Sequence, residues 1–80
     1  PKKSIANKRK HGLDFVEAQV LWEDPDRLKV PARTQGESRF MLIAMLSGKH
    51  WSAVFTLRGE KIRIVSVQRA RPTEVEKYED

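Results

Sequence analysis

Cysteine is absent from this chain of 80 residues. Its absence excludes disulfide bonds and thiolate metal sites, and it fits the reducing cytoplasm in which we expect the protein to act. The sequence also has no apolar run near the roughly 20 residues that a membrane span needs, and nothing in it resembles a secretory leader. We therefore expect a soluble protein with no membrane association.

Motifs that bind metals or nucleotides are missing as well. The chain has neither zinc-type ligand spacing nor a glycine-rich phosphate loop, and it contains no internal repeat. We expect no metal and no cofactor. A chain this short buries only about 60% of its unfolded surface, so residues 1–80 have room for one domain with a small core.

Positive charge is concentrated in two blocks, and the net charge is +5. Residues 1–11 carry five bases and no acid, and residues 58–71 carry five bases against Glu60. The residues between the blocks are nearly balanced, and residues 72–80 are acidic. If the fold brings the two blocks together, they form a face that attracts nucleic acid through counterion release; if they point apart, that interpretation weakens.

The second block places four arginines and one lysine along a predicted strand and its exit. A guanidinium stays charged at any physiological pH and can donate two parallel hydrogen bonds to a phosphate. Arginines on a rigid strand therefore suit a polyanion. A strand that is charged outward merely for solubility is the alternative explanation.

Local patterns predict an α+β fold, with a small antiparallel β-sheet packed against two N-terminal helices and a short C-terminal helix. The first helix should span Lys2 to His11 and stop at Gly12, which readily takes the left-handed backbone found beyond helix ends. Asp14 should cap the second helix, with Glu17 completing a capping box. We expect Trp22 on this helix to pack in the core.

A short edge strand over Leu28–Val30 should follow, limited by Pro31, and then a polar loop over Thr34–Glu37. Pro72 can open the final helix, which should end at Tyr78.

Three more strands should form an antiparallel meander. Tight turns at Ser47-Gly48 and Arg58-Gly59 should join them. A change of phase between Ile64 and Val65 indicates a β-bulge or a strand that is buried on both sides. The strands are Arg39–Leu46, His50–Leu57 and Lys61–Gln68.

Short motifs spread over nearly the whole chain occur in a characteristic order. The most specific are a Lys10-His11-Gly12 turn and a run that combines Arg63-Ile64, Ser66 and Arg69-Ala70. The weaker ones are Asn7, Phe15, Glu17, Ala18, Asp24, Glu37, Arg39-Phe40, Arg58-Gly59, Glu74 and Tyr78. Together they resemble the BrnT family, the toxin half of a bacterial type II toxin–antitoxin pair.

The resemblance implies a fold like that of the RelE-type ribonuclease toxins and an activity that cleaves RNA and halts growth. It also implies a partner, a BrnA-type antitoxin that covers the toxin and binds DNA, so that the complex regulates transcription. Family members usually begin with an aromatic-rich strand just before the equivalent of Pro1. We expect that strand to be missing here.

The family usually has arginine at the position of Gln68. Glutamine has nearly the reach of arginine, but it has no charge and only two donors. It would keep the shape of a site while removing electrostatic stabilisation of a phosphorane-like transition state. We therefore expect an attenuated toxin, either a natural variant or a deliberately inactivated one.

Metal-independent RNA cleavage requires a deprotonated ribose 2′-hydroxyl, a protonated leaving oxygen and neutralisation of the extra charge on phosphorus. Arginines meet the third need, and we assign phosphate binding and charge stabilisation to Arg39, Arg58 and Arg63. The other candidate catalytic residues are Gln68, Glu37 and Tyr78. The candidate RNA-binding residues are Lys10, His11, Arg69 and Arg71.

The sequence leaves the general acid and base open. His11 is a candidate because histidine titrates near neutral pH, but its place at a helix C-terminus explains it equally well as a cap. Glu37 is either a base or, the ordinary explanation, an ion-pair partner of Arg39. Tyr78 either orients a leaving group or packs. Arg69 is a weaker candidate, because adjacent strand positions point to opposite faces.

Two functions from other classes fit the same pattern. A nucleic-acid-binding module would use the basic strands without catalysis, and a protein-interaction domain would offer its basic surface to an acidic partner. The second is compatible with a toxin, since an antitoxin must cover the toxin's surface.

Overall fold

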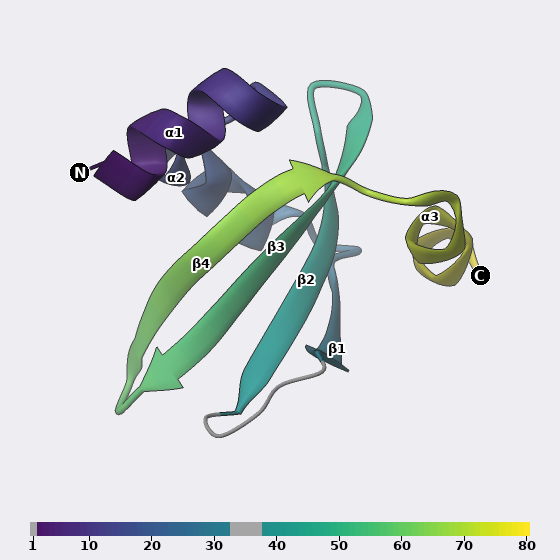
Figure 1. The fold of residues 1–80 in the computed structure, drawn as a ribbon. Coiled ribbons are helices and arrows are strands. Elements are labelled where there is room, and N and C mark those ends of the chain that lie inside the picture. The colour runs from purple at the N-terminus through teal and green to yellow at the C-terminus, as the bar shows by residue number, and fades with distance from the viewer. Residues whose placement is uncertain (1, 33–37) are drawn as a thin grey trace.

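A meander of β-strands forms the centre of the molecule in a computed structural model, which describes residues 2–32 and 38–80 (Figure 1). The strands lie in chain order and pair antiparallel. They are β1 (Leu28–Ala32), β2 (Arg39–Leu46), β3 (Lys49–Arg58) and β4 (Lys61–Arg69). The helices are α1 (Lys2–His11), α2 (Phe15–Ala18), the 3-10 helix η1 (Gln19–Glu23) and α3 (Pro72–Glu79). The predicted α+β class is confirmed.

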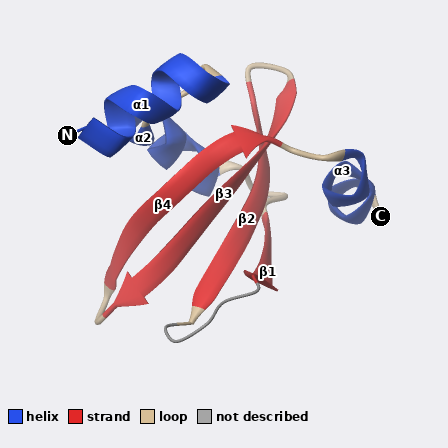
Figure 2. Ribbon diagram, viewed as in Figure 1, coloured by secondary structure: helices blue, strands red, loops and turns tan. Residues whose placement is uncertain are grey.

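The helices flank the sheet rather than enclose it (Figure 2). Helices α1 and α2 contact β4, η1 contacts β2, and α3 contacts β2 from the opposite side of the view. The buried core lies between the sheet and the segment that contains α2 and η1. It consists of Leu13, Ala18, Leu21, Leu42, Ala44, Trp51, Ala53, Phe55 and Val67.

The helix ends follow the predicted signals. Gly12, with φ of +89°, follows the last residue of α1, and its N–H donates to the Lys8 carbonyl oxygen at 2.9 Å. The capping box of α2 is present: the Glu17 N–H donates to Asp14 Oδ1 at 2.7 Å, and the Asp14 N–H donates to Glu17 Oε1 at 3.0 Å. Trp22 packs edge-on against Phe55, with 5.2 Å between ring centroids, as expected of a core residue.

Strand β1 runs further than predicted. It continues through Pro31, which lies opposite Phe40, and ends at Ala32. The predicted end at Val30 was wrong, because an edge strand tolerates a proline whose missing N–H faces away from the ladder. The predicted loop over Thr34–Glu37 lies outside the described residues.

Both hairpin turns use backbone with positive φ, but the second lies one residue later than predicted. Ser47 and Gly48 have φ of 53° and 75°, as expected for a tight two-residue turn. Arg58 pairs with Lys61, so Gly59 and Glu60 form the second turn. The turn is centred there because Gly59, with φ of 62°, takes the left-handed conformation without strain.

The predicted bulge is confirmed in β4. Val54 pairs with Ser66 and the next residue, Phe55, pairs with Ile64, so Val65 is the extra residue. A bulge shifts the alternation of side chains by one position. This shift decides which face of the sheet each arginine of β4 occupies.

Candidate functional site

Three of the predicted arginines share the side of the sheet opposite α2 and η1. We call this side the arginine face, and it is defined by Arg39, Arg58 and Arg63. Leu42, Ala53 and Phe55 point into the core beneath α2 and η1. Their strand neighbours Met41 and Val54, which pair with each other, therefore point to the opposite side, the arginine face. Alternation along β2 adds Arg39 to that face.

Alternation along β3 adds Thr56 and Arg58 to the arginine face. The pairs of Thr56 with Arg63 and of Arg58 with Lys61 then add two residues of β4. Arg39, Thr56 and Arg63 therefore form one row across β2, β3 and β4.

The bulge at Val65 places Arg63 and Gln68 on the same face. In a regular strand, two residues five positions apart would point to opposite sides. Because Gln68 pairs with Ser52, two positions from Val54, its side chain also belongs to the arginine face. Ser52 and Thr56 are four residues apart, so the Gln68 row lies about 14 Å along the strands from the Arg63 row.

Two hydroxyl groups on this face are buried. Ser52 is 1% exposed and Thr56 is 2% exposed, and neither side-chain oxygen has a hydrogen-bond partner among residues 2–32 and 38–80. An unsatisfied buried hydroxyl is costly. Neither residue was predicted as part of the site, although the polar positions of β3 alternate with the apolar residues of the core.

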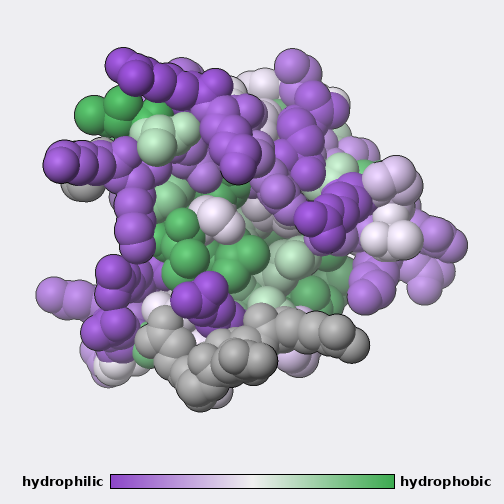
Figure 3. Space-filling model, viewed as in Figure 1, coloured by the Kyte–Doolittle hydropathy of each residue, from purple (hydrophilic) through white to green (hydrophobic). Residues whose placement is uncertain are grey.

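The arginine face has an apolar centre. Figure 3, which looks onto this side of the sheet, shows an apolar area framed by hydrophilic side chains. Met41 and Val54, both half-buried, pair at the middle of this face, next to Ser66. The charged groups are thus arranged around a surface of low polarity.

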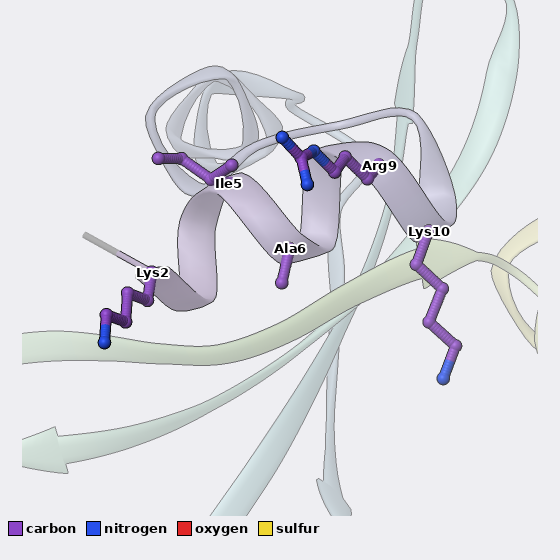
Figure 4. Close-up of a pocket in the computed structure, with 5 residues that line it drawn as sticks. All are labelled: Lys2, Ile5, Ala6, Arg9 and Lys10. Carbon is purple, nitrogen blue, oxygen red and sulfur yellow. The ribbon is translucent and has the colours of Figure 1, made fainter.

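The two basic blocks lie next to each other. Helix α1 is fixed against β4 by Asn7, whose Nδ2 donates to the Val67 carbonyl oxygen at 2.8 Å and whose Oδ1 accepts from the Val67 N–H at 3.1 Å. The charges of α1 do not all point one way: in Figure 4, Lys2 and Lys10 extend from one side of the helix and Arg9 from the other. Half-buried His11 is the last residue of the helix.

The other predicted RNA-binding arginines lie apart from Arg63. Arg69 pairs with Trp51 on the helix-covered face, where its guanidinium lies 5.6 Å from the ring centroid. Arg71 precedes α3, and its backbone N–H donates to Glu74 Oε1 at 2.8 Å.

Tyr78 lies at the opposite end of the sheet from the Arg63 row. Its hydroxyl donates to Asp24 Oδ2 at 2.7 Å, and its ring packs edge-on against His50 at 5.2 Å. The hydrogen bond to Asp24 raises the pKa of Tyr78 to about 12 and lowers the pKa of Asp24. His50 is six residues from Thr56 along β3, a separation of about 20 Å.

Asp24 connects three parts of the chain. Besides the Tyr78 hydroxyl, its Oδ2 accepts from the Met45 N–H at 2.9 Å, and its Oδ1 accepts from the Asp26 N–H. His50 Nε2 and Glu79 Oε2 add a hydrogen bond of 2.8 Å. These contacts fix α3 to the hairpin of β2 and β3.

Glu37, the remaining predicted site residue, lies outside the described residues. Among residues 2–32 and 38–80, no three side chains of histidine, aspartate or glutamate are grouped to hold a metal ion. No helix in these ranges is long and apolar enough to cross a membrane.

Comparison with known families identifies the chain. The sequence model of the ribonuclease toxin BrnT of type II toxin–antitoxin systems matches residues 1–74. The chain belongs to the BrnT family. The resemblance predicted from the Lys10-His11-Gly12 and Arg63-Ile64 motifs is therefore confirmed. Comparison with curated proteins found no match.

Membership of the BrnT family gives the chain the role of a toxin with an antitoxin protein as its partner. The matched residues include α1 and the whole sheet, and thus every arginine of the arginine face. Tyr78 lies beyond the match.

Proposed function

We propose that this BrnT-family toxin is an endoribonuclease that binds RNA across the arginine face and cleaves it without a metal ion. The row of Arg39, Thr56 and Arg63 is the observation that supports this proposal. Neighbouring strands lie about 4.8 Å apart, so the two arginine backbones are separated by about 10 Å. Two long side chains that start at this separation can both contact one phosphodiester.

The guanidiniums supply the electrostatic part of the reaction. They bind the phosphate in the ground state and stabilise the additional charge on phosphorus as the 2′-oxygen attacks. Arg58 and Lys61, one row further on, extend the positive surface to a neighbouring phosphate. The hydroxyl of Thr56, between the arginines, is a further donor for the same phosphate once the RNA displaces the groups that bury it.

Fewer observations bear on the residues that transfer protons than on the arginines that bind phosphate. Glu37 is a candidate general base on sequence grounds alone, with an ion pair to Arg39 as its alternative role. Tyr78 already donates its proton to Asp24, and its pKa of about 12 makes it a poor acid at neutral pH. We therefore assign Tyr78 a packing role, one of the two that the sequence left open.

Gln68 attenuates the enzyme in this proposal. Its position on the arginine face means that an arginine there would add a fourth guanidinium to the same surface. Removal of one preorganised donor from such a site typically costs about 100-fold to 1000-fold in rate. The cytoplasm is the proposed compartment, and a DNA-binding antitoxin of the BrnA type is the proposed neutralising partner.

A cleavage assay with matched arginine variants tests the proposal. The Gln68→Arg variant, incubated with RNA in the presence of a chelator, should cleave at least tenfold faster than the parent chain. Adding Arg63→Ala to it should abolish that gain. Adding Arg27→Ala, which removes the same charge at an exposed position outside the arginine face, should leave it intact.

Three outcomes would count against the proposal. Salt-sensitive RNA binding by all variants without cleavage would favour a binding module. Equal cleavage by the Arg63→Ala and Arg27→Ala variants would remove the arginine face from the mechanism. Activity that the chelator abolishes would overturn metal independence.

A further inference from the structure

An apolar row crosses the middle of the arginine face. Met41 of β2 pairs with Val30 of β1 on one side and with Val54 of β3 on the other, so the three side chains point to the same side of the sheet. We call these three half-buried residues the apolar row. Val54 in turn pairs with Ser66, which places a hydroxyl at the β4 end of the row. Because Met41 is two residues from Arg39, the apolar row lies about 7 Å along the strands from the row of Arg39.

Polar rows lie on both sides of the apolar row. The row of Arg39 and Arg63 is on one side, and the pair of Ser52 and Gln68 is two residues beyond Val54 on the other. The solvated side of an antiparallel sheet usually carries polar side chains throughout. An apolar area framed by hydrophilic groups, as Figure 3 shows here, is instead typical of a surface that binds a ligand.

The two neighbouring rows match the two parts of a nucleotide. The guanidiniums of Arg39 and Arg63 attract a phosphate, and the apolar row beside them suits the flat, weakly polar face of a nucleobase. Met41 lies at the centre of the row, and its flexible thioether makes favourable contacts with aromatic rings. The hydroxyl of Ser66 can donate to or accept from the polar edge of the same base.

We propose that the apolar row holds the base of a nucleotide that flanks the phosphate bound by Arg39 and Arg63, and that the toxin therefore selects single-stranded RNA. The inference rests on the RNA binding of the proposed function. In a duplex each base is stacked between its neighbours, so only an unpaired base can turn its face to the row. Val30, Met41 and Val54 offer no N–H or O–H donor, and the row therefore accepts any of the four bases.

Charge and family membership favour RNA over other occupants. A second copy of the toxin would bring the arginines of two such faces together, and like charges across an interface repel. An acidic protein segment would match the charge. The match to a family of ribonuclease toxins favours RNA over such a segment.

Binding of three uncleavable ligands of equal length to the full chain tests the proposal. They are a single-stranded 2′-O-methyl RNA, the same strand without bases, and the 2′-O-methyl duplex. A surface that binds by charge alone would prefer the duplex, which carries more phosphates per unit length. The parent chain should instead bind the single strand more tightly than the duplex, and about tenfold more tightly than the abasic strand.

Two variants of Met41 test the contact with the base. Met41→Ala shortens the side chain at the centre of the row, and Met41→Leu nearly keeps its volume. Met41→Ala should weaken binding of the single strand by about threefold to tenfold and leave binding of the abasic strand unchanged. Met41→Leu should bind both ligands like the parent chain. In both variants the slope of log K against log salt should keep the parent value, because no phosphate contact is lost.

The possible results distinguish this inference from the proposed function. Equal affinity of the parent chain for the single strand and the abasic strand would overturn the base contact and leave phosphate binding by the arginine face intact. Equal losses for both ligands in Met41→Ala would give Met41 a structural role and would also overturn it. Weaker binding of the antitoxin by Met41→Ala, with unchanged binding of RNA, would assign the apolar row to the protein partner instead. Binding of none of the three ligands would overturn the proposed function itself.

Discussion

Replacing Asn7 by alanine should be among the most destabilising single changes in this protein. The side chain is buried, and it makes hydrogen bonds to two main-chain segments: Nδ2 donates to the Leu13 carbonyl oxygen at 2.7 Å as well as to Val67, and Oδ1 accepts from Val67. Each bond contributes about 1 kcal/mol net. Alanine favours a helix over asparagine by about 0.5 kcal/mol, which leaves an expected loss of about 2.5 kcal/mol.

Urea denaturation, followed by the fluorescence of Trp22 and Trp51, measures this loss. For a domain of this size, 1 kcal/mol corresponds to about 4–8 °C, so the melting temperature should fall by about 10–20 °C. Lys3→Ala, an exposed change on the same helix, is the control and should change stability by less than about 0.5 kcal/mol. An Asn7→Ala variant as stable as this control would refute the claim that Asn7 fixes α1 to β4.

Other predictions concern the contacts that fix α3 and end α1. Tyr78→Phe should cost about 1 kcal/mol at neutral pH, since it removes a charge-assisted hydrogen bond to Asp24 that is partly screened by solvent. Because the folded-state pKa of Tyr78 is raised from 10.0 to about 12, this contribution is complete below pH 10 and is lost as pH rises through 12; stability curves of the two proteins should converge over that range. Gly12→Ala should cost about 1 kcal/mol in thermal denaturation, because φ of +89° strains a residue with a Cβ, and an unchanged melting temperature would exclude that strain.

Local signals were enough to predict most of the secondary structure. The end of α1 at Gly12 and the capping box of Asp14 and Glu17 depend on residues within a few positions of each other, and both are confirmed. The strands of the meander differ from the predicted ones by at most one residue at each end. The end of β1 was missed because tolerance of Pro31 depends on its place at the edge of the sheet.

The arrangement of the site depends on contacts that the sequence does not specify. The phase change at Ile64 and Val65 left two explanations open, and only the register with β3 shows that the bulge moves Gln68 to the side of Arg63. The bonds of Asn7 to Val67 span 60 positions, so no local pattern predicts them. The signal that was available is the pair of polar residues, Ser4 and Asn7, one turn apart on the buried side of α1.

The salt dependence of RNA binding is the most direct test of the claim that the arginine face binds RNA. An uncleavable 2′-O-methyl RNA can be titrated with the parent chain and with Arg63→Ala, Arg39→Ala and Arg27→Ala over a series of salt concentrations. Loss of one phosphate contact lowers the slope of log K against log salt by about 0.7 for single-stranded RNA. The account predicts this decrease for Arg63→Ala and Arg39→Ala and the parent slope for Arg27→Ala. Slopes that are the same in all four proteins would contradict it.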